Sequence, residues 1–587
     1  MSKEIWSGLG AESPNSRSFE ATIASKRIGA KLGAAQLAAL QRCTAVRFGP
    51  VFGGMNPPKQ PILILWGQPP FLKNIALERQ NITMEHKNSI TMQALIDALE
   101  QESLLVDFSC PRQFYSHTFT YLSYSSADVE ENTLFICKGA AFKAQYLQEA
   151  AGKGSAAYLA ETKFPQVDLP YIQVTDIRRA MAVVSALFYG RAWQAMKVVG
   201  ITGTKGKTTT TYFMKNILDQ FCGKRTAVLS TIEVYTGVED HDAHLTTPEA
   251  PDLHKHFAQV RQSGIPYMTM EVSSQAYKMH RVDGVEFDVG MFLNIGEDHI
   301  GPLEHEDFQD YLNCKLQLMS HCKTAVINKN ADYFAEAFQA AQGGGAKVIT
   351  YGTDSSCTYW VDEIEKTPTG FSFVIHGEGF QTPFAITMAG RFNVENALAA
   401  FAAAKALGID DGSIAEGFAA NQVRGRMNLF EKDGVTVIVD YAHNYLSFSK
   451  LYESLKLDYP GRRIVVVFGC PGGHAYLRRR DIGTLSGKYA DYIYLTAEDP
   501  QFEDVTEICR EIAAYIEPFH TPYEIIPDRT QAVEKAIRTA KEGDVILLAA
   551  KGEEVYQKVR GEYVYFESDI AITKRCLAGQ QAEQETK

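Results

Sequence analysis

A glycine-rich turn between an apolar run and a helix-length segment constrains the fold of this 587-residue chain more than any other feature. The run Val198-Val199-Gly200-Ile201 is typical of a buried strand, and residues 208–221 have the length of a helix. Between them lies Gly203-Thr204-Lys205-Gly206-Lys207-Thr208-Thr209. Glycine lets backbone N–H groups approach a phosphate, and a helix N-terminus favours negative charge. The order therefore predicts a phosphate-binding strand–turn–helix unit within an α/β fold.

Two side chains of this turn predict nucleotide chemistry. Lys207 can neutralise the β- and γ-phosphate oxygens of ATP, and the hydroxyl of Thr208 can ligate Mg²⁺. Strict Walker spacing requires glycine where Ile201 stands, so an ordinary glycine turn remains an alternative. The predicted ATP contacts in the turn are Gly203, Thr204, Lys205, Gly206, Lys207, Thr208 and Thr209.

Two further predicted strands end in polar side chains. Glu271 follows Met270 at the end of one predicted strand. His299 comes shortly after the apolar residues 289–293, which form the other. Because the carboxyl ends of parallel strands face the ligand crevice, Glu271 and His299 are candidates to complete Mg²⁺ coordination beside ATP. A lone glutamate or histidine is more often structural or solvated than a metal ligand, so only the combination supports this prediction.

Size and composition limit the architecture and the partners. A chain of 65.2 kDa is too long for one hydrophobic core, which favours several domains. The net charge of −12 argues against nucleic acid and anionic membrane as general partners. The ten cysteines form no Cys-x-x-Cys pair, which predicts reduced thiols and no tetrahedral metal site. With no run of roughly 18 apolar residues and no secretory signal, a cytoplasmic location is expected.

The rhythm of apolar runs predicts four segments. Residues 1–83 show no strand–helix rhythm and receive no function; Met84 or a nearby position is a hypothetical native start. Residues 84–195 predict a small α/β domain, with a helix capped by Thr91 and a strand at 133–137. Residues 196–423 contain the nucleotide turn. Residues 424–587 predict a mostly parallel sheet from the apolar runs 436–440, 464–468, 492–495 and 545–549.

Over about residues 120–575 the chain resembles the Mur ligases, and among them the MurE branch that adds the third residue of the peptidoglycan stem, in particular its L-lysine-adding type. The motifs that carry the resemblance lie in the family's order. They are residues 203–209, Leu245-Thr246-Thr247-Pro248-Glu249, Glu271-Val272-Ser273-Ser274-Gln275, His280-Arg281-Val282, Asp298-His299-Ile300-Gly301-Pro302, Asn393-Val394-Glu395-Asn396-Ala397, Gly425-Arg426-Met427, Asp440-Tyr441-Ala442-His443-Asn444 and Thr496-Ala497-Glu498-Asp499-Pro500.

The resemblance implies an α/β architecture of three domains: one for the UDP end of the substrate, a P-loop-type central ATPase, and a C-terminal Rossmann-like domain that closes over the amino acid. It implies that Lys315 is a carbamate made with CO₂ and ligates a second Mg²⁺, although a lone helix lysine is usually exposed. The implied precursor contacts are Ser126, Thr246, Thr247, Ser273 and Arg281, and the further ATP contacts are Asn396, Arg426, Asp440 and His443.

Two departures from the family pattern affect substrate binding. Tyr124-Ser125-Ser126-Ala127 stands where the family often has Tyr-Asp-Ser-Arg. In the selectivity loop, Glu498-Asp499-Pro500-Gln501 replaces the Asp-Asn-Pro-Arg typical of diaminopimelate enzymes, whose arginine can pair with the extra carboxylate. The acids Glu498, Asp499, Glu503 and Asp504 suit a terminal ammonium, although they can equally form a solvated helix entry.

The resemblance thus implies a monomeric, ATP-dependent ligase that uses two Mg²⁺ ions. It would join L-lysine, through an acyl phosphate, to UDP-N-acetylmuramoyl-L-alanyl-D-glutamate in peptidoglycan precursor synthesis. Glu554, in Lys551-Gly552-Glu553-Glu554, would contact the incoming amino group. A meso-diaminopimelate or ornithine ligase, a P-loop kinase or ATPase, and a non-catalytic Mur-like protein remain as alternatives.

Overall fold

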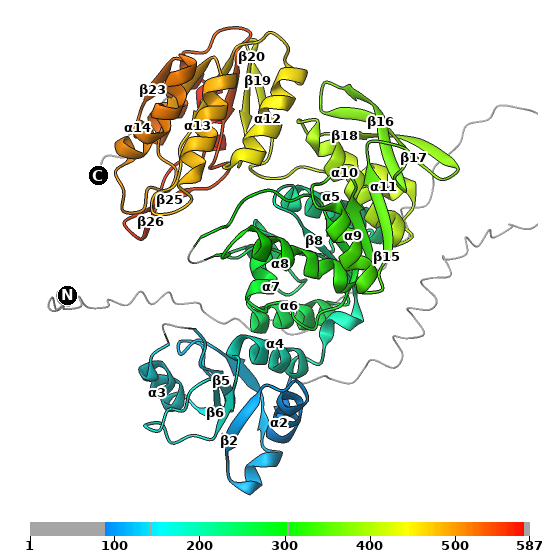
Figure 1. Ribbon diagram of the computed structural model, residues 1–587, viewed down its shortest axis with the longest axis vertical. Coiled ribbons are helices and arrows are strands. Elements are labelled where there is room, and N and C mark those ends of the chain that lie inside the picture. Colours follow the sequence, from blue (N-terminus) through cyan, green and yellow to red (C-terminus); the bar gives the residue numbers. More distant parts are fainter. Residues whose placement is uncertain (1–87, 140–141, 302–303, 580–587) are drawn as a thin grey trace, which may run out of the picture. The chain divides into compact units, whose positions relative to one another are not determined.

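The computed structural model describes residues 88–139, 142–301 and 304–579 (Figure 1). The hypotheses on residues 1–83 and on Met84 lie outside the described residues. Three large sheets lie within the described chain, one in each of the segments 84–195, 196–423 and 424–587. The limits of these domains themselves stay a prediction.

The first sheet has five strands in the order β2-β7-β6-β5-β4, of which only β2 is antiparallel to its neighbour. Thr91 caps helix α2 by accepting a hydrogen bond from the backbone N–H of Ala94, as the sequence predicts. The strands are β2 (Leu105–Ser109), β4 (Tyr121–Ser123), β5 (Thr133–Ile136), β6 (Ser155–Ala160) and β7 (Tyr171–Val174), and the helices α2 (Met92–Gln101), α3 (Ala144–Gly152) and α4 (Ile177–Phe188).

The second sheet has eleven strands in the order β11-β10-β9-β12-β8-β13-β14-β15-β16-β17-β18. The seven strands from β9 to β16 in this order are parallel. They comprise β8 (Lys197–Thr202), β9 (Ala227–Leu229), β12 (Tyr267–Glu271), β13 (Phe287–Phe292), β14 (Cys322–Asn328), β15 (Lys347–Gly352) and β16 (Tyr359–Lys366). Antiparallel hairpins extend both edges, with β10 (Glu233–Tyr235) and β11 (Asp240–Asp242) at one and β17 (Phe371–Gly377) and β18 (Phe380–Ile386) at the other.

The residues of β8 alternate between the two hydrophobic cores of this sheet. Val198 packs in one core, with α6 (Ala250–Ser263), α7 (Ser274–Lys278), α8 (Phe308–Ser320) and α9 (Phe334–Gly343). Val199 and Ile201 pack in the other, with α5 (Lys207–Cys222), α10 (Phe392–Ala406) and α11 (Asp411–Ala419). Because β12 and β13 flank β8 in parallel, the three strands end at the same edge, where the glycine-rich turn begins.

The third sheet has six strands in the order β19-β20-β24-β21-β22-β23, and all but the β19–β20 pair are parallel, as predicted. Its strands are β19 (Asn428–Lys432), β20 (Val435–Val439), β21 (Ile464–Phe468), β22 (Tyr492–Leu495), β23 (Tyr523–Ile525) and β24 (Val545–Leu548). Its helices are α12 (Tyr445–Asp458), α13 (Leu477–Tyr489), α14 (Val505–Ile516), α15 (Arg529–Arg538) and α16 (Asp569–Leu577), and a hairpin of β25 (Tyr556–Val559) and β26 (Glu562–Tyr565) precedes α16.

Two features of the described residues concern the cysteines and the length of the helices. All nine cysteines within the described ranges are free thiols, and six of them are buried. None of the helices in residues 88–139, 142–301 and 304–579 combines the length and apolar content that a bilayer-spanning segment requires.

Candidate functional site

The turn after β8 has a backbone that glycine alone tolerates at Gly206. Its φ of +84° lies in the left-handed region, and a Cβ atom there would lie 2.5 Å from Oδ1 of Asn396. Asn396, predicted to contact ATP, is buried in α10 and donates from Nδ2 to Oδ1 of Asn393 at 2.9 Å. The turn therefore rests directly on α10, which fixes its backbone where a phosphate would bind.

The half-buried Lys207 and the buried Lys315 meet at one carbonyl of the turn. Nζ of Lys207 and Nζ of Lys315 each donate to the backbone oxygen of Gly203 at 2.9 Å. Burial lowers the pKa of both ammonium groups. Lys315 is only 2% exposed, so the expectation from its helix alone, a lysine at the surface, is wrong. The structure brings the two lysines that the sequence singled out to the same point.

Glu271 lies at the end of β12, beside the first turn of α5. Its Oε1 accepts hydrogen bonds from the backbone N–H and the hydroxyl of Thr231, at 2.9 and 3.2 Å. Oγ1 of Thr231 lies 3.0 Å from Oγ1 of Thr208, so one threonine joins the two predicted metal ligands. Oε2 of Glu271 is buried and has no hydrogen-bond partner among the described residues. A hard cation such as Mg²⁺ fits this carboxylate and hydroxyl pair.

His299 lies apart from that pair, in the segment after β13. Its Nδ1 is 2.7 Å from Oε1 of Glu304, and its side chain is 44% exposed. The backbone of His299 has a φ of +56°, which is strained for a residue with a side chain. No hydrogen bond or ion pair between described residues joins His299 to Glu271.

Lys205 links the turn to its neighbours. The backbone N–H of Lys205 donates to Oδ1 of Asn294 at 2.9 Å, and Nδ2 of Asn294 donates back to the Lys205 carbonyl at 3.0 Å. Nζ of Lys205 lies 3.3 Å from Nε2 of His443 and 3.7 Å from Oδ2 of Asp298. Burial lowers the pKa of Lys205 to about 7, so this side chain can exchange protons near neutrality.

Asp440 and Arg426, both predicted to contact ATP, have internal partners. The Asp440 carboxylate accepts from the backbone N–H of Met427 at 2.9 Å and of Ala442 at 2.8 Å, and burial raises its pKa. The guanidinium of Arg426 lies 4.5 Å from the ring centre of Tyr441. The carboxylate thus holds the peptide segments that carry Arg426 and His443.

Three of the predicted precursor contacts form one cluster. Oγ1 of Thr247 donates to the backbone oxygen of Glu271 at 2.9 Å and accepts from the backbone N–H of Ser273 at 3.2 Å. Arg281 donates to the Thr247 carbonyl at 3.1 Å and to Oε1 of Glu249 at 2.9 Å. Glu271 therefore serves two segments, with its side chain toward the nucleotide turn and its carbonyl toward the precursor cluster.

Glu249 forms ion pairs with three cationic side chains. Besides Arg281, Lys138 lies 3.1 Å and Arg178 3.7 Å from its Oε2. Burial raises the pKa of Glu249, but Arg281, Lys138 and Arg178 together hold it below its usual value. Because Lys138 and Arg178 belong to the segment of the first sheet, this carboxylate connects that segment to the nucleotide-binding one.

Ser126 and Thr246 are not part of this cluster. Oγ of Ser126 donates to Oε2 of Glu149 at 2.9 Å, and Nζ of Lys153 donates to the Ser126 carbonyl at 2.5 Å. Thr246 is partly buried next to Thr247. Lys153 thus brings a cation to the backbone of Ser126, the residue before Ala127.

Most acids near the predicted selectivity loop are already paired. Nζ of the buried Lys551 lies 2.8 Å from Oδ1 of Asp499 and also forms an ion pair with Glu554. Oε1 of Glu554 accepts from the hydroxyl of Tyr441 at 2.8 Å. One lysine thus partly neutralises two of the acids assigned to the amino-acid substrate.

The other acids divide between the two predicted roles, which are to form the entry of a helix or to bind a substrate ammonium. Glu503 pairs with Arg479 at 2.8 Å, and Asp504 caps α14, so both belong to the helix entry. Glu498 has no hydrogen bond or ion pair within the described chain, and burial raises its pKa to about 7. The acidic neighbourhood is therefore narrower than expected and centres on Glu498.

The backbone of the selectivity loop is held by the β25–β26 hairpin. Gln501 has a φ of +54°, and its N–H donates to the carbonyl of Lys558 at 2.9 Å. A Cβ atom on Gly472 would lie 2.0 Å from the carbonyl oxygen of Pro500, so glycine is required there. These contacts hold the backbone at Pro500 and Gln501, shortly after Glu498.

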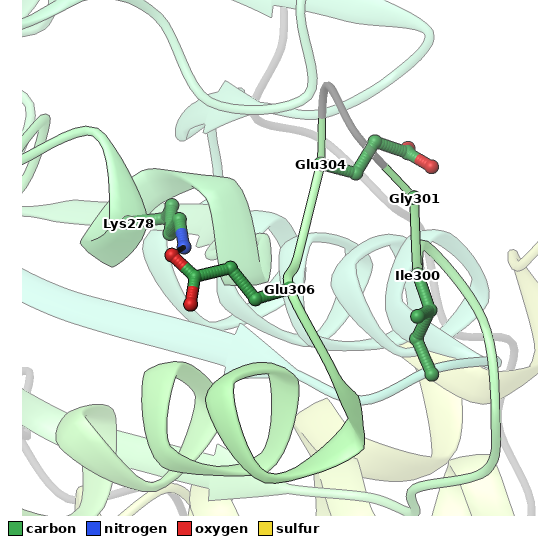
Figure 2. A pocket seen from close by; sticks show the side chains of 5 residues that line it. All are labelled: Lys278, Ile300, Gly301, Glu304 and Glu306. Carbon is green, nitrogen blue, oxygen red and sulfur yellow. Dashed lines mark ion pairs between the residues drawn. The ribbon is translucent and has the colours of Figure 1, made fainter.

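A surface pocket of about 530 Å³ lies next to His299 in the chain rather than over the nucleotide turn (Figure 2). Its lining is Lys278, Ile300, Gly301, Glu304 and Glu306. The mixed charges of this lining pair with each other or with neighbours, as between Lys278 and Glu306 at 3.9 Å. We assign it no ligand.

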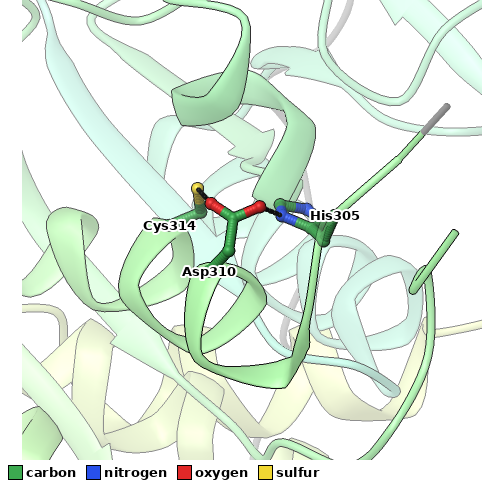
Figure 3. A group of neighbouring side chains, drawn as sticks. All are labelled: His305, Asp310 and Cys314. Carbon is green, nitrogen blue, oxygen red and sulfur yellow. Dashed lines mark hydrogen bonds and ion pairs between the residues drawn. The ribbon is translucent and has the colours of Figure 1, made fainter. Parts of the chain in front are cut away.

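His305, Asp310 and Cys314 have ligand atoms within 4.8 Å of one another (Figure 3). The ammonium of Lys278 lies 2.6 Å from Oδ2 of Asp310 and already supplies a cation there. Asp310 also accepts from the backbone N–H of Glu306 at 3.3 Å. The group is thus an internally satisfied network, and the predicted Mg²⁺ ligands remain Thr208, Glu271, His299 and Lys315.

Sequence reasoning missed several residues of the site. Thr231 follows β9 and Asn294 follows β13, so the rule that polar residues at the ends of parallel strands face the crevice could have found both. Glu249 and Lys551 stand in the quoted motifs, but pairing across distant segments gives no signal in a single sequence.

Comparisons with known proteins all find similarity to Mur ligases. A family model described as Mur ligase middle domain matches residues 201–404, and one described as Mur ligase, glutamate ligase domain, matches residues 425–552. The chain is 38% identical over 501 residues to the UDP-N-acetylmuramoyl-L-alanyl-D-glutamate–L-lysine ligase of Enterococcus faecalis, covering 83% of this chain and 98% of that protein. It is 40% identical over 471 residues to the ligase of the same name in Streptococcus sanguinis, covering 79% and 95%.

Solved structures share the fold at lower identity. A UDP-N-acetylmuramoyl-L-alanyl-D-glutamate–2,6-diaminopimelate ligase aligns with a TM-score of 0.59 at 22% identity, over 84% of this chain and all of that one. MurF ligase from Thermotoga maritima in complex with ADP aligns with a TM-score of 0.52 at 18% identity, over 78% and 96%. At these identities the likeness establishes the arrangement of sheets and helices.

Proposed function

The chain belongs to the Mur ligase family, and from this membership we propose that it joins L-lysine to the D-glutamyl carboxylate of UDP-N-acetylmuramoyl-L-alanyl-D-glutamate, converting ATP to ADP and phosphate. The curated relatives at 38–40% identity carry this activity in their names. The class of enzyme agrees with the ATP-dependent ligase predicted from the sequence. We place the reaction in the cytoplasm, where ATP is available, and expect a monomer.

One observation carries this function: Glu271 joins the nucleotide turn to the precursor cluster. Its carboxylate reaches Thr208 through Thr231, while its backbone oxygen binds Thr247. A phosphoryl group held on the turn and a carboxylate held beside Thr247 would therefore be brought together by the same strand end. This arrangement suits transfer between two bound substrates better than simple ATP hydrolysis.

The residues at the turn fit Mg²⁺. Oε2 of Glu271 is buried without a partner, and the hydroxyl of Thr208 lies beside the same threonine that Glu271 binds. We assign Thr208, Glu271 and His299 as metal ligands. When bound, Mg²⁺ would neutralise charge on the transferring phosphoryl group.

We propose that Lys315 carries a carbamate. Burial lowers the pKa of its ammonium, and the neutral amine is the form that reacts with CO₂. The amine nitrogen would bond to the carbon of CO₂ and lose a proton, which leaves a carboxylate-like group beside Gly203. Such oxygens suit a second Mg²⁺.

The chemistry starts from an unreactive carboxylate. Its oxygen would attack the γ-phosphorus of ATP, ADP would leave, and an acyl phosphate would result. The α-amine of lysine would then attack the carbonyl carbon, and phosphate would leave from the tetrahedral adduct as the amine loses a proton. Lys207 would stabilise the charge that develops on the phosphoryl oxygens, because its ammonium is held at the turn by Gly203.

Lysine is favoured over diaminopimelate by the charge of the loop. Gln501 offers no cation for a second carboxylate, whereas Glu498 offers an unpaired acid for an ammonium. Lys551 leaves only part of the charge of Asp499 and Glu554 available, so we assign Glu498 the main contact to the side-chain ammonium of the substrate.

Phosphate release that depends on both the precursor and an amino acid tests this function, with lysine, ornithine and meso-diaminopimelate compared. We expect activity with lysine, and Lys207→Ala should reduce turnover by at least about 100-fold because one preorganised charge is lost at the reacting phosphate. Lys323→Ala, at an exposed position on β14, serves as the control. Activity with diaminopimelate and none with lysine would overturn the assignment of the substrate.

A further inference from the structure

His305 has a completely buried side chain in which both ring nitrogens are occupied. Nε2 lies 2.9 Å from Oγ of Ser274, the first residue of α7, and Nδ1 lies 2.9 Å from Oδ2 of Asp310 on α8. Figure 3 shows the ring pointing at Asp310. Burial lowers the pKa of His305, so the neutral ring donates to one partner and accepts from the other. The imidazole therefore joins two helices of the same core.

The backbone of His305 forms hydrogen bonds with a second segment, the one that carries His299. Its N–H donates to the carbonyl oxygen of His299 at 3.0 Å, and its own carbonyl accepts from the N–H of Gly301 at 3.0 Å. His299 is the residue with the strained φ of +56°. A non-glycine residue stays in that region only when its surroundings hold it there, and the His305 N–H is one of those restraints.

The two ends of this connection lie on different parts of the proposed site. Ser274 directly follows Ser273, which caps α7 and whose N–H binds Thr247 of the precursor cluster. His299 is the assigned metal ligand. His305 thus joins the precursor-binding segment to the metal-binding segment by a side-chain contact at one end and a backbone contact at the other.

Full burial determines the kind of role that His305 can have. Ser274, His305 and Asp310 follow one another in the hydrogen-bonded order of a nucleophile, base and acid. Ser274 is only 3% exposed and His305 is 0% exposed, so neither can touch a substrate. The ion pair of Asp310 with Lys278 further holds the acid in place. The arrangement positions other residues.

We propose that His305 is a positioning residue that sets the place of His299 relative to the precursor-binding end of α7. This inference rests on the proposed function for the assignment of His299 as a metal ligand. Loss of the imidazole would release the His305 backbone from α7 and α8, so that its N–H no longer holds His299 in the strained conformation. The metal would then bind less tightly although every assigned ligand is still present.

Calorimetric titration of ADP into the full-length protein, with Mg²⁺ and then with EDTA, tests the proposal without turnover. The quantity to compare is the gain in ADP affinity that Mg²⁺ produces. His305→Ala should reduce this gain by about 10-fold, the effect typical of removing a group that orients a metal ligand, and leave the affinity in EDTA unchanged. Ser274→Ala, which removes only the Nε2 partner, should shift the gain in the same direction by a smaller factor.

Two reference variants make each result decisive. His299→Ala should reduce the gain as His305→Ala does, whereas His376→Ala, in the β17 hairpin, should leave it unchanged. If His305→Ala and Ser274→Ala both keep the wild-type gain while His299→Ala loses it, His305 serves stability alone and the proposal fails. If His305→Ala does not fold, Ser274→Ala decides. If His299→Ala keeps the gain, the proposed metal ligand is wrong, which is a failure of the proposed function instead.

Discussion

Glu498 is the acid of the selectivity loop whose charge changes near neutral pH. Its carboxylate has no hydrogen bond or ion pair among the described residues, and burial raises its pKa to about 7. An acid with a raised pKa is neutral below that value and ionised above it. The loop therefore gains a negative charge as the pH rises through 7, at the place where a substrate ammonium would bind.

We expect the KM for lysine to fall as the pH rises from 6 to 8, because ionised Glu498 attracts the ammonium. Glu498→Gln should raise the KM at pH 8 by about 10- to 100-fold, the loss of a hydrogen bond to a charged group, and should abolish its dependence on pH. Steady-state kinetics at saturating ATP and precursor measure both effects. Glu507→Gln, an exposed change on α14, should retain the wild-type profile; a pH dependence that survives in Glu498→Gln would assign it to another group.

At the scale of single residues, the sequence predicted positions better than pairings. The turn, Glu271 and the strand ends are local features, so Lys207 and Thr208 could be identified from residue type and order. The burial of Lys315 could not, because a helix lysine looks the same in sequence whether it faces water or the carbonyl of Gly203. Nor could the pairing of Lys551 with Asp499, which depends on two loops meeting.

Among the secondary-structure elements, a buried ion pair fixes the loops of the third sheet. Arg529, the first residue of α15, donates from Nε and Nη2 to the carboxylate of Asp569, the first residue of α16, at 2.9 and 2.6 Å. Its guanidinium also donates to the carbonyls of Ala497 and Ala549, at 3.2 and 2.7 Å. These alanines follow β22 and β24, so one arginine holds the starts of the Glu498 and Lys551 loops.

Arg529→Met should lower the free energy of unfolding by about 3–5 kcal/mol, because Asp569 is left buried without its partner. The loss in the free energy of unfolding would be measured by urea unfolding, monitored by fluorescence and by hydrogen exchange of the third sheet. Arg538→Ala on the same helix removes a partly exposed pair with Glu534 and should cost no more than about 1 kcal/mol. Equal losses for the two variants would contradict a special role for the buried pair.

The apolar runs predicted the elements of the third sheet because buried parallel strands leave a strong local signal. The predicted runs 464–468 and 492–495 coincide with β21 and β22. The edge hairpins β10–β11 and β17–β18 were not anticipated, since β11 consists of exposed polar residues and its pairing is set by β10. Strand order likewise depends on contacts between distant segments, which a single sequence does not record.

At the scale of the whole molecule, Asp298 connects the nucleotide-binding segment to the third sheet. Oδ1 of Asp298 lies 3.2 Å from Nη2 of Arg478, and Oδ2 accepts from Nδ2 of Asn444 at 2.5 Å. Burial opposes ionisation of this carboxyl group, but Lys205, His299 and Arg478 hold its pKa well below the usual range. Since Lys205 belongs to the glycine-rich turn, the same carboxylate contacts the proposed ATP site and the C-terminal segment.

Arg478→Gln should therefore weaken the contact between the C-terminal segment and Asp298, and with it the use of ATP. Removing one partner of a mostly buried pair costs about 2 kcal/mol or more, so kcat/KM for ATP should fall by about 30-fold or more. Arg480→Gln, whose exposed side chain forms an ion pair among the described residues only with its neighbour Asp481, should remain near wild type. In a double-mutant cycle, the combined loss of Asp298→Asn and Arg478→Gln should be smaller than the sum of the two single losses, because both changes break the same pair. Additive losses would mean that the two residues act separately, and Asp298 would then serve the nucleotide turn alone.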